Sequence, residues 1–301
     1  MKKERKIICI VGPTASGKTG WGVSVARKFN GEIISADSRQ VYKKLDIGTG
    51  KDLEDYGDIK YHLIDVKNPG EKFTLFDWLK AARQAIDDIL ERGKLPVVVG
   101  GTGLYVQALV EGFMLEKSKI QNPNVEKYGR EELESKTLEQ LQTIFLKLTA
   151  KGSNLKVVDL KNPHRIIRAI EKFQSGEIAY KEKPNFQALQ IAVDLPRDVL
   201  YDRVDQRVEE RFEQGMLEEV KNLITSGVDK KWLLGLGLEY RIIGRYVLGE
   251  NSQSFPEMEQ ELKYKIHAFA RRQLTWFRRF PEIVWCKDLK SAEEEIKKFL
   301  I

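Results

Sequence analysis

The amino-acid sequence predicts an α/β protein, with a parallel-sheet core and an inserted all-helical lobe. Over the first hundred residues, short apolar runs alternate with segments of helical periodicity, which is the pattern of β-α-β units. After residue 112 the pattern changes to helical stretches separated by polar breaks, until a strand-like run returns near residue 188. We therefore assign 1–112 and 187–301 to the core and 113–186 to the lobe.

The first half of the core contains four predicted strands, at 7–11, 32–36, 61–66 and 95–99. A helix is predicted between the last two strands, because apolar residues recur there at helical spacing. Thr74 is its expected N-cap and Gly93 its expected end. One face of this helix carries Leu75, Trp78, Leu79, Ala82, Ile86, Ile89 and Leu90.

The rest of the chain is predicted to be mainly helical, with two further strands. The lobe shows no clear strand and has two helical stretches, while the core resumes with a strand and long helices. In chain order, the predicted elements are helices at 130–150 and 163–176, a strand at 188–195, helices through 201–227 and 256–280, a strand at 282–286 and a short terminal helix.

Composition indicates a soluble, cytoplasmic protein of 301 residues. Cys9 and Cys286 lie far apart in apolar runs and form no metal-binding pattern, so we expect two buried thiols in a reducing compartment. No apolar stretch approaches the roughly 20 residues that span a bilayer, so we expect no membrane association. Nothing indicates an obligate interface, and we expect a monomer.

The charge is moderately basic, with a net value of +6 and a pI near 9.0, which favours a polyanionic partner. The predicted lobe holds fourteen Lys or Arg against ten Asp or Glu, and 262–281 holds six basic residues and no acid. Such stripes are either solvated faces or nucleic-acid contacts. The same choice applies to the aromatic residues among the basic ones near the end, which either pack in the core or stack on bases: Phe269, Trp276, Phe277 and Phe280.

The strongest motif is GPTASGKT, residues 12–19, which matches the phosphate-binding pattern G-x-x-x-x-G-K-[ST] between a predicted strand and a predicted helix. Gly12 and Gly17 let successive backbone N–H groups point inward, Lys18 adds a positive charge, and Thr19 offers a hydroxyl to Mg²⁺. The core is therefore expected to be P-loop NTPase-like. The motif leaves open a kinase, an NTPase and a transferase that releases diphosphate.

Other polar residues follow the predicted strands at the edge of the sheet where α/β proteins bind ligands. Asp37 follows the second strand and is a candidate general base, or else the N-cap of a short helix. Asp65 either reaches Mg²⁺ through water or caps the next turn. The Gly-rich loop 100–103 places the hydroxyl of Thr102 at the same edge.

Several segments together resemble the tRNA dimethylallyltransferases of the bacterial type, also called tRNA isopentenyltransferases. This family attaches a dimethylallyl group to N6 of the adenine 3′ to the anticodon. The resemblance runs from about residue 6 to residue 285 and is densest in the first 110. It rests on the segments GPTASGKT, ISADSRQVYKKLDIGTGK, HLIDV, VVVGGTGLYVQAL and FARRQLTWFRR.

The resemblance implies a role for particular residues, with dimethylallyl diphosphate and the anticodon stem-loop of tRNA as partners and Mg²⁺ as cofactor. Asp37, Thr102, Lys18 and Arg211 would be catalytic, with Asp37 as the general base and Thr19 helping to hold Mg²⁺. The diphosphate would bind Gly12, Pro13, Thr14, Ala15, Ser16, Gly17, Lys18 and Thr19. The tRNA would contact Asp37, Ser38, Arg39, Gln40 and Thr102, and in the lobe His164, Arg165, Ile166, Ile167 and Arg168.

Two segments depart from the family's pattern. The usual His-Pro-Asn-Asp stretch reads DLKN at 159–162, and the common Ile-Gly-Tyr motif reads GLEYR at 237–241. Prenylation of free adenine nucleotides is an alternative activity, although the basic lobe favours an RNA substrate. A small-molecule kinase is a further alternative.

Overall fold

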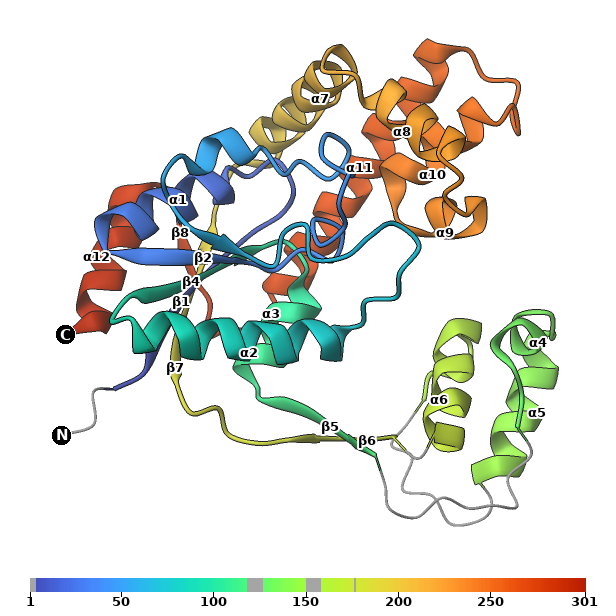
Figure 1. The fold of residues 1–301 in the computed structure, drawn as a ribbon, viewed down its shortest axis with the longest axis horizontal. Helices are drawn as coiled ribbons and strands as arrows, with labels where there is room; N and C mark the ends of the chain where they lie inside the picture. Colours follow the sequence, from blue (N-terminus) through green and yellow to red (C-terminus); the bar gives the residue numbers. More distant parts are fainter. Residues whose placement is uncertain (1–3, 118–126, 150–157, 176) are drawn as a thin grey trace. The chain divides into compact units, whose positions relative to one another are not determined.

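The computed structural model describes residues 4–117, 127–149, 158–175 and 177–301 (Figure 1). The chain separates into two compact units. The first consists of Met1–Glu111 and Pro184–Ile301, and the second is Gly112–Lys183, close to the predicted insertion at 113–186.

A six-stranded sheet forms the centre of the first unit, and all of its neighbouring strands are parallel, as predicted. The strand order is β3-β2-β4-β1-β7-β8. Ile10 on β1 is in register with Val99 on β4 and Ile191 on β7, so apolar side chains line up across the middle of the sheet. The strands are β1 Lys6–Val11, β2 Gly31–Ser35, β3 Tyr61–His62, β4 Leu95–Gly100, β7 Gln187–Val193 and β8 Val284–Cys286.

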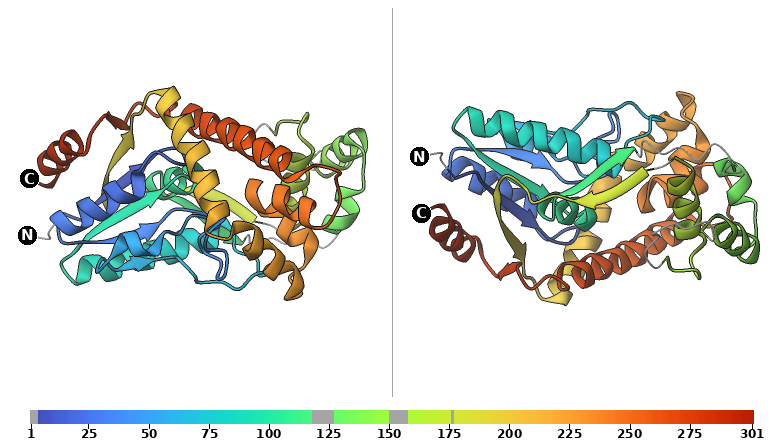
Figure 2. Two further views of the ribbon diagram at one scale, coloured as in Figure 1. Left: turned by 90° about the horizontal axis from the view of Figure 1, so that it is seen from above. Right: turned by 90° about the horizontal axis from the view of Figure 1, so that it is seen from below.

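Helices cover both faces of this sheet (Figures 1 and 2). Helices α1 (Lys18–Lys28) and α12 (Leu289–Leu300) pack on one face, around the fully buried Ile8 and Ile10. On the opposite face lies α2 (Leu75–Glu91), and α3 (Gly103–Val110) follows β4. The predicted cap at Thr74 is confirmed as a capping box with Asp77.

The C-terminal half adds five helices, which share a second apolar core. The predicted helix through 201–227 is two helices, because Gly215 adopts a left-handed φ of +99° between them. Among the described residues, no helix combines the length and apolar character that crossing a bilayer requires. The five helices are α7 Arg197–Glu213, α8 Met216–Thr225, α9 Lys230–Gly235, α10 Leu238–Val247 and α11 Phe255–Phe277. Neither α9 nor α10 was predicted.

The predicted strand at 61–66 is wrong beyond its first two residues. Leu63 and Asp65 have positive φ angles of 65° and 57°, which a strand cannot contain. The chain therefore leaves the sheet after His62. A short 3₁₀ helix, Leu53–Tyr56, precedes this strand.

The sequence predicted that the inserted lobe is all-helical, but the second unit also contains two strands. Strands β5 (Phe113–Lys117) and β6 (Glu177–Lys181) pair antiparallel at the two ends of the insertion. The predicted helix at 130–150 divides into α4 (Arg130–Glu134) and α5 (Leu138–Thr149), because Thr137 and Gln140 form a cap that starts a new helix. Helix α6 (Pro163–Ser175) packs with both of them around Leu133, Phe145 and Ile166.

Candidate active site

The loop between β1 and α1 carries the predicted phosphate-binding residues. Gly17 has a left-handed φ of +84°, which turns the chain into α1 at little steric cost. The Nζ atom of Lys18 folds back over the loop and donates a hydrogen bond to the carbonyl of Pro13 at 3.1 Å. The loop thus places a lysine and the N-terminus of a helix around one concave space, an arrangement suited to phosphate.

Asp37 lies two residues after the end of β2 and caps a turn, where the sequence had suggested the N-cap of a short helix. Its Oδ1 atom accepts the backbone N–H of Arg39 at 2.8 Å and that of Gln40 at 3.4 Å. These bonds fix the orientation of the carboxylate, which also lines a cavity beside the phosphate loop. Capping and catalysis are therefore compatible roles for this residue.

The Gly-rich loop after β4 packs too closely on its neighbours for larger residues. A Cβ atom on Gly100 would lie 2.2 Å from the carbonyl oxygen of Ala36, and one on Gly103 would lie 2.2 Å from the ring of Trp276. The Oγ1 atom of Thr102 accepts the backbone N–H of Ser38 at 3.3 Å. This contact joins the loop after β4 to the turn that carries Asp37.

Gln273, on α11, connects the phosphate loop to the Gly-rich loop. Its side-chain oxygen accepts the N–H of Thr14 at 2.9 Å, and its side-chain nitrogen donates to the carbonyl of Gly101 at 2.8 Å. The side chain is 8% exposed, so both bonds are shielded from water. Gln273 lies in the segment FARRQLTWFRR, which contributes to the family resemblance, but no role was predicted for it from the sequence.

These three loops surround a cavity of about 530 Å³, which α7, α10 and α11 complete. Aromatic side chains from α11, including Phe269 and Trp276, form one part of its wall. Nine of the residues predicted from the sequence line it together: Thr14, Lys18, Thr19, Asp37, Ser38, Arg39, Gln40, Thr102 and Arg211.

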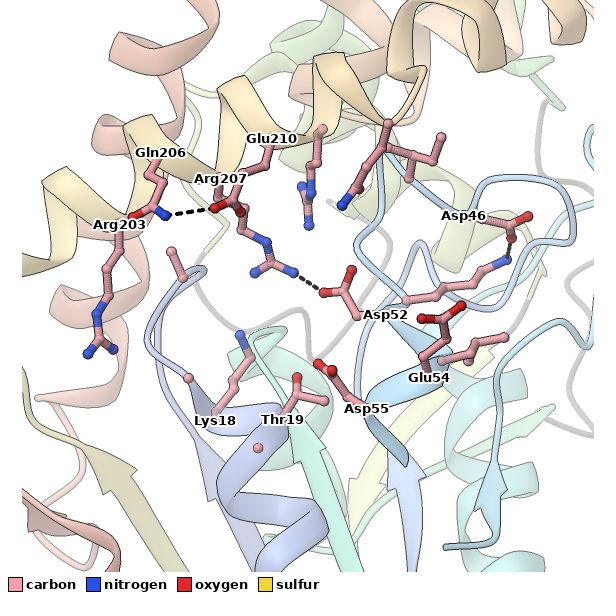
Figure 3. Close-up of a pocket in the computed structure, with 18 residues that line it drawn as sticks. Lys18, Thr19, Asp46, Asp52, Glu54, Asp55, Arg203, Gln206, Arg207 and Glu210 are labelled. Carbon is pink, nitrogen blue, oxygen red and sulfur yellow. Dashed lines mark hydrogen bonds and ion pairs between the residues drawn. The ribbon is translucent and has the colours of Figure 1, made fainter. Parts of the chain in front are cut away.

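A second cavity, of about 950 Å³, lies between the phosphate loop, the segment 46–55 and α7 (Figure 3). Ala15 and Gly17 line this cavity only. Gly12, Pro13 and Ser16 line neither cavity, and Ser16 is buried, so they shape the loop. Their contact with the diphosphate stays a prediction. Both cavities share Lys18, Thr19, Arg207 and Arg211.

The shared residues concentrate positive charge between the two cavities. Burial and, to a smaller extent, the neighbouring Arg207 lower the pKa of Lys18 to about 8, while Asp37 opposes the shift. Burial likewise lowers the pKa of Arg211 to about 10, again with a contribution from Arg207. Arg211 is 7% exposed and forms no ion pair with any described residue. Three crowded cations of this kind favour a multiply charged anion.

Arg207 already has a carboxylate partner across the second cavity. Its guanidinium contacts Asp52 at 2.5 Å, and the two residues connect α7 to the segment 46–55 (Figure 3). The signal in the sequence was weak, because Arg207 and Asp52 are separated by more than 150 residues. Sequence reasoning assigned no role to either residue.

Oxygen atoms of the kind that Mg²⁺ prefers line the second cavity. The carboxylates of Asp52, Glu54 and Asp55 line the same cavity as the Thr19 hydroxyl (Figure 3). No group of three His, Cys, Asp or Glu side chains that could hold a metal ion occurs within the described ranges. This donor set fits an ion that is shared with the phosphates of a substrate, which is the usual way that Mg²⁺ is held.

Asp65 does not belong to this donor set. It forms an ion pair with Lys51, a side chain that is 1% exposed. Lys51 also contacts Asp46 and donates to the carbonyl of Tyr42 at 2.8 Å. Asp65 therefore stabilises the segment 46–51 by neutralising a buried lysine. Neither of the two roles considered from the sequence, Mg²⁺ binding or turn capping, describes this contact.

Glu219, on α8, also holds the segment 46–51, through hydrogen bonds to its backbone. Its carboxylate accepts the backbone N–H groups of Asp46, Ile47 and Gly48, at 2.7, 2.7 and 3.1 Å, and the hydroxyl of Tyr240 at 2.8 Å. The loop positioned in this way brings Gly50 against Arg211, where a Cβ atom would lie 1.8 Å from a guanidinium nitrogen.

Gln40 also serves this segment. Its amide nitrogen donates to the carbonyl of Gly50 at 2.9 Å, and its amide oxygen accepts the Ser35 hydroxyl at 2.8 Å. Both ends of the amide are thus engaged within the protein. Gln40 lines the cavity and its polar atoms hold the loop, while its contact with tRNA stays a prediction.

The predicted tRNA-contacting residues of the lobe lie on α6, in the second unit. His164, Arg165 and Arg168 are exposed there. The side chains of Ile166 and Ile167 are 0% and 2% exposed, in the apolar core of that unit. The same helical periodicity that exposes the arginines buries the side chains of the isoleucines. A contact of Ile166 and Ile167 with tRNA therefore stays a prediction, and their buried side chains do not support it.

The fold and the cavity residues define a P-loop α/β enzyme in which a phosphate-binding motif lies next to an oriented carboxylate. Two family models match the chain: IPP transferase over residues 40–280 and Isopentenyl transferase over residues 5–57. The chain belongs to the tRNA dimethylallyltransferase (IPP transferase) family, and it is a prenyltransferase. The resemblance inferred from the sequence is confirmed.

Curated relatives match the chain over nearly its whole length. The tRNA dimethylallyltransferase 1 of Parabacteroides distasonis is 39% identical, covering 98% of this chain and 96% of the relative. The tRNA dimethylallyltransferase 2 of Trichlorobacter lovleyi is 44% identical, covering 91% and 88%. The crystal structure of the tRNA isopentenylpyrophosphate transferase from Bacillus halodurans is similar, with a TM-score of 0.70 and 34% identity, covering 99% of this chain and 96% of that one.

Proposed function

We propose that this protein transfers the dimethylallyl group of dimethylallyl diphosphate to N6 of the adenine 3′ to the anticodon in tRNA, and releases diphosphate. One observation carries the proposal. A single cavity holds the carboxylate of Asp37 together with the cationic groups of Lys18 and Arg211. A base for the nucleophile and positive charge for the leaving group thus border the same space, in a chain that belongs to this family.

The leaving group is the diphosphate. As the bond between the allylic carbon and oxygen breaks, negative charge develops on the departing phosphate oxygens, and fixed cations lower the energy of that state. Lys18 supplies such charge from a partly buried position and Arg211 from a buried one, and Arg207 lies beside them. Mg²⁺ held by Thr19 and the neighbouring carboxylates would add further positive charge at the same oxygens.

The nucleophile is the exocyclic amine of adenine. The N6 atom forms a bond to the allylic carbon, and one N6 proton passes to the carboxylate of Asp37, which acts as general base. The proton, the prenyl group and the diphosphate are thereby all accounted for, with no redox step. The turn that Asp37 caps supports this role, because its backbone N–H groups hold the carboxylate at one orientation before the substrate arrives.

The acceptor base must leave its stack to enter the cavity. Phe269 and Trp276 are available in the cavity wall to stack on an extruded purine, and Arg272 lies over the ring of Phe269. His164, Arg165 and Arg168 are exposed cationic or polar side chains of the second unit that suit the phosphates of the anticodon arm.

The test is an incubation of the purified protein with Mg²⁺ and labelled dimethylallyl diphosphate. An unmodified tRNA transcript or AMP is offered as acceptor, and the products are identified by mass spectrometry of nucleosides. We expect label in the adenosine 3′ to the anticodon. Label found only on AMP indicates a free-nucleotide prenyltransferase, and rapid ATP hydrolysis without prenylation indicates a kinase or NTPase.

A further inference from the structure

The proposed mechanism leaves one carboxyl group in the cavity without a role. Glu239 lies in the first turn of α10 and lines the same cavity as Asp37, Lys18 and Arg211. It belongs to the segment GLEYR, in which the sequence departs from the pattern of its family.

The position of Glu239 is fixed by its neighbours in the chain. Tyr240 is 1% exposed and donates its hydroxyl to Glu219 at 2.8 Å. On the other side, a Cβ atom on Gly237 would lie 3.6 Å from Nε of Arg39. The start of α10 is therefore anchored beside the residues expected to contact the acceptor nucleotide, and Glu239 projects from an ordered frame.

The surroundings of Glu239 favour its uncharged form. Burial raises the pKa of its carboxyl group, Asp37 raises it further, and Arg211 and Arg207 oppose the shift. Neither arginine forms an ion pair with it, and within the described part of the chain it has no cation at contact distance. A half-buried acid that shares a cavity with a second carboxylate and has no ion-pair partner is suited to donate a hydrogen bond in its protonated form.

A protonated carboxyl group offers one donor and one acceptor side by side. The N6–N7 edge of adenine presents a matching pair, because N6 carries a donor hydrogen and N7 is an acceptor. The corresponding edge of guanine presents two acceptors, O6 and N7, so the acid can form only one of the two bonds there. A protonated carboxyl group at this edge therefore distinguishes adenine from guanine.

We propose that Glu239 selects adenine by pairing with its N6–N7 edge, while Asp37 accepts the other N6 proton. The inference rests on the proposed function, since it names how the acceptor base of that reaction is recognised. Each of the two carboxyl groups then contacts one of the two N6 hydrogens. Glu239 accepts the N6 hydrogen on the N7 side, donates its own hydrogen to N7, and leaves the second N6 hydrogen for the general base.

The test compares transcripts that carry either adenine or 7-deazaadenine, which lacks the N7 acceptor, at the modified position. Four proteins are assayed: the wild type, Glu239→Gln, Glu239→Ala and Glu213→Ala. Glu213 is an exposed residue at the end of α7 that lines neither cavity, so its variant controls for the loss of a carboxylate. The readout is the ratio of kcat/KM for the two transcripts.

We expect the wild type to lose roughly ten- to a hundred-fold in kcat/KM with 7-deazaadenine, the range for one good bidentate base contact. Glu239→Gln should keep the same ratio, because an amide also presents a donor beside an acceptor. Glu239→Ala should bring the ratio close to one. Glu213→Ala should behave as the wild type does.

An equal loss with 7-deazaadenine in the wild type and in Glu239→Ala overturns the inference. So does a Glu239→Ala variant whose only change is a higher KM for dimethylallyl diphosphate, since the residue then acts through Arg211. Thermal unfolding of each variant shows whether it is folded. If the alanine variant is unstable, the ratio of kcat/KM measured for Glu239→Gln still tests the inference. A wild type that prenylates neither transcript contradicts the proposed function itself, which is a separate result.

Discussion

The side-chain oxygen of Gln273 accepts a hydrogen bond from the backbone N–H of Thr14 at 2.9 Å, so a helix near the C-terminus holds the phosphate loop near the N-terminus. The same amide donates to Gly101 at 2.8 Å. Two loops that follow neighbouring strands, β1 and β4, are thereby held at a set separation. The cavity between them thus depends on a residue that is far from both loops in the sequence.

Replacing Gln273 by leucine should disturb the phosphate loop. The side chain keeps a similar volume but loses both hydrogen bonds, which leaves a buried N–H and a buried carbonyl without partners. We expect a free energy of unfolding lower by about 1–3 kcal/mol and a higher KM for dimethylallyl diphosphate. Denaturant unfolding and steady-state kinetics measure the two effects.

Gln273→Glu separates the two contacts, because a carboxylate accepts from Thr14 but cannot donate to Gly101. Thr275→Ala, an exposed position on the same helix, is the control. Unchanged stability and an unchanged KM in Gln273→Leu would contradict the coupling of the two loops.

Asp37 can be divided into its two roles by a pair of variants. Asp37→Asn keeps an oxygen that accepts the N–H of Arg39, but it cannot take a proton, whereas Asp37→Ala loses both abilities. We expect both variants to lower turnover by roughly 10² to 10⁴, as for loss of a general base. Only the alanine variant should also lose stability, by about 1 kcal/mol.

Single-turnover prenylation and thermal unfolding distinguish the outcomes for Asp37. Asp288→Asn is the control. Asp288 caps α12 by accepting the N–H of Ser291, so this variant removes a capping carboxylate of the same kind outside the cavities. Near-normal turnover in Asp37→Asn would remove Asp37 as the base and leave it only the capping role.

The phosphate loop and Asp37 could be predicted because their positions depend on local patterns. A glycine-rich motif between a strand and a helix needs only its own spacing, and an acid that follows a strand must emerge at one edge of a parallel sheet. Glu219 and Gln273 could not be found in this way. Their backbone partners lie more than 170 residues away, and nothing in the sequence near them indicates which backbone groups they will meet.

The errors have the same origin. The run at 61–66 is apolar enough for a strand, yet Asp65 turns out of the sheet, where its carboxylate meets the buried Lys51. A tertiary ion pair thus accompanies a backbone that local propensity does not favour. In the lobe, the resemblance named consecutive residues as a tRNA contact, although Arg165 is exposed on α6 while the side chain of Ile166 is buried.

Glu32 should make the stability of the core depend on pH. Burial by itself would raise its pKa, but hydrogen bonds from His62, Arg92 and Lys94 outweigh burial and lower the pKa to about 2. Because the folded pKa lies below the unfolded value, the carboxylate stabilises the fold above about pH 4.5, and this contribution is lost as the pH falls toward 2.

Glu32→Gln should therefore be less stable than the wild type at pH 7, by on the order of 2–3 kcal/mol. The difference should shrink steadily between about pH 5 and pH 2. Urea unfolding of both proteins across this range measures it, with Glu213→Gln as an exposed control. A difference that stays constant with pH would show that the amide disturbs packing and that the ion pairs contribute little.

Arg165 should contribute to tRNA binding through its charge. It is 66% exposed on α6, and its 3.5 Å contact with Asp159 is a surface ion pair, which contributes little to stability. Arg165→Ala should weaken tRNA binding without unfolding the lobe, and it should reduce the slope of log affinity against log salt by roughly one. Arg27→Ala is a matched control, because Arg27 is 58% exposed and pairs with Asp58 at 3.4 Å, but lies on α1 in the other unit. Filter binding of a tRNA transcript at several salt concentrations measures both variants, and equal slopes for Arg165→Ala and the wild type would place the RNA contact elsewhere.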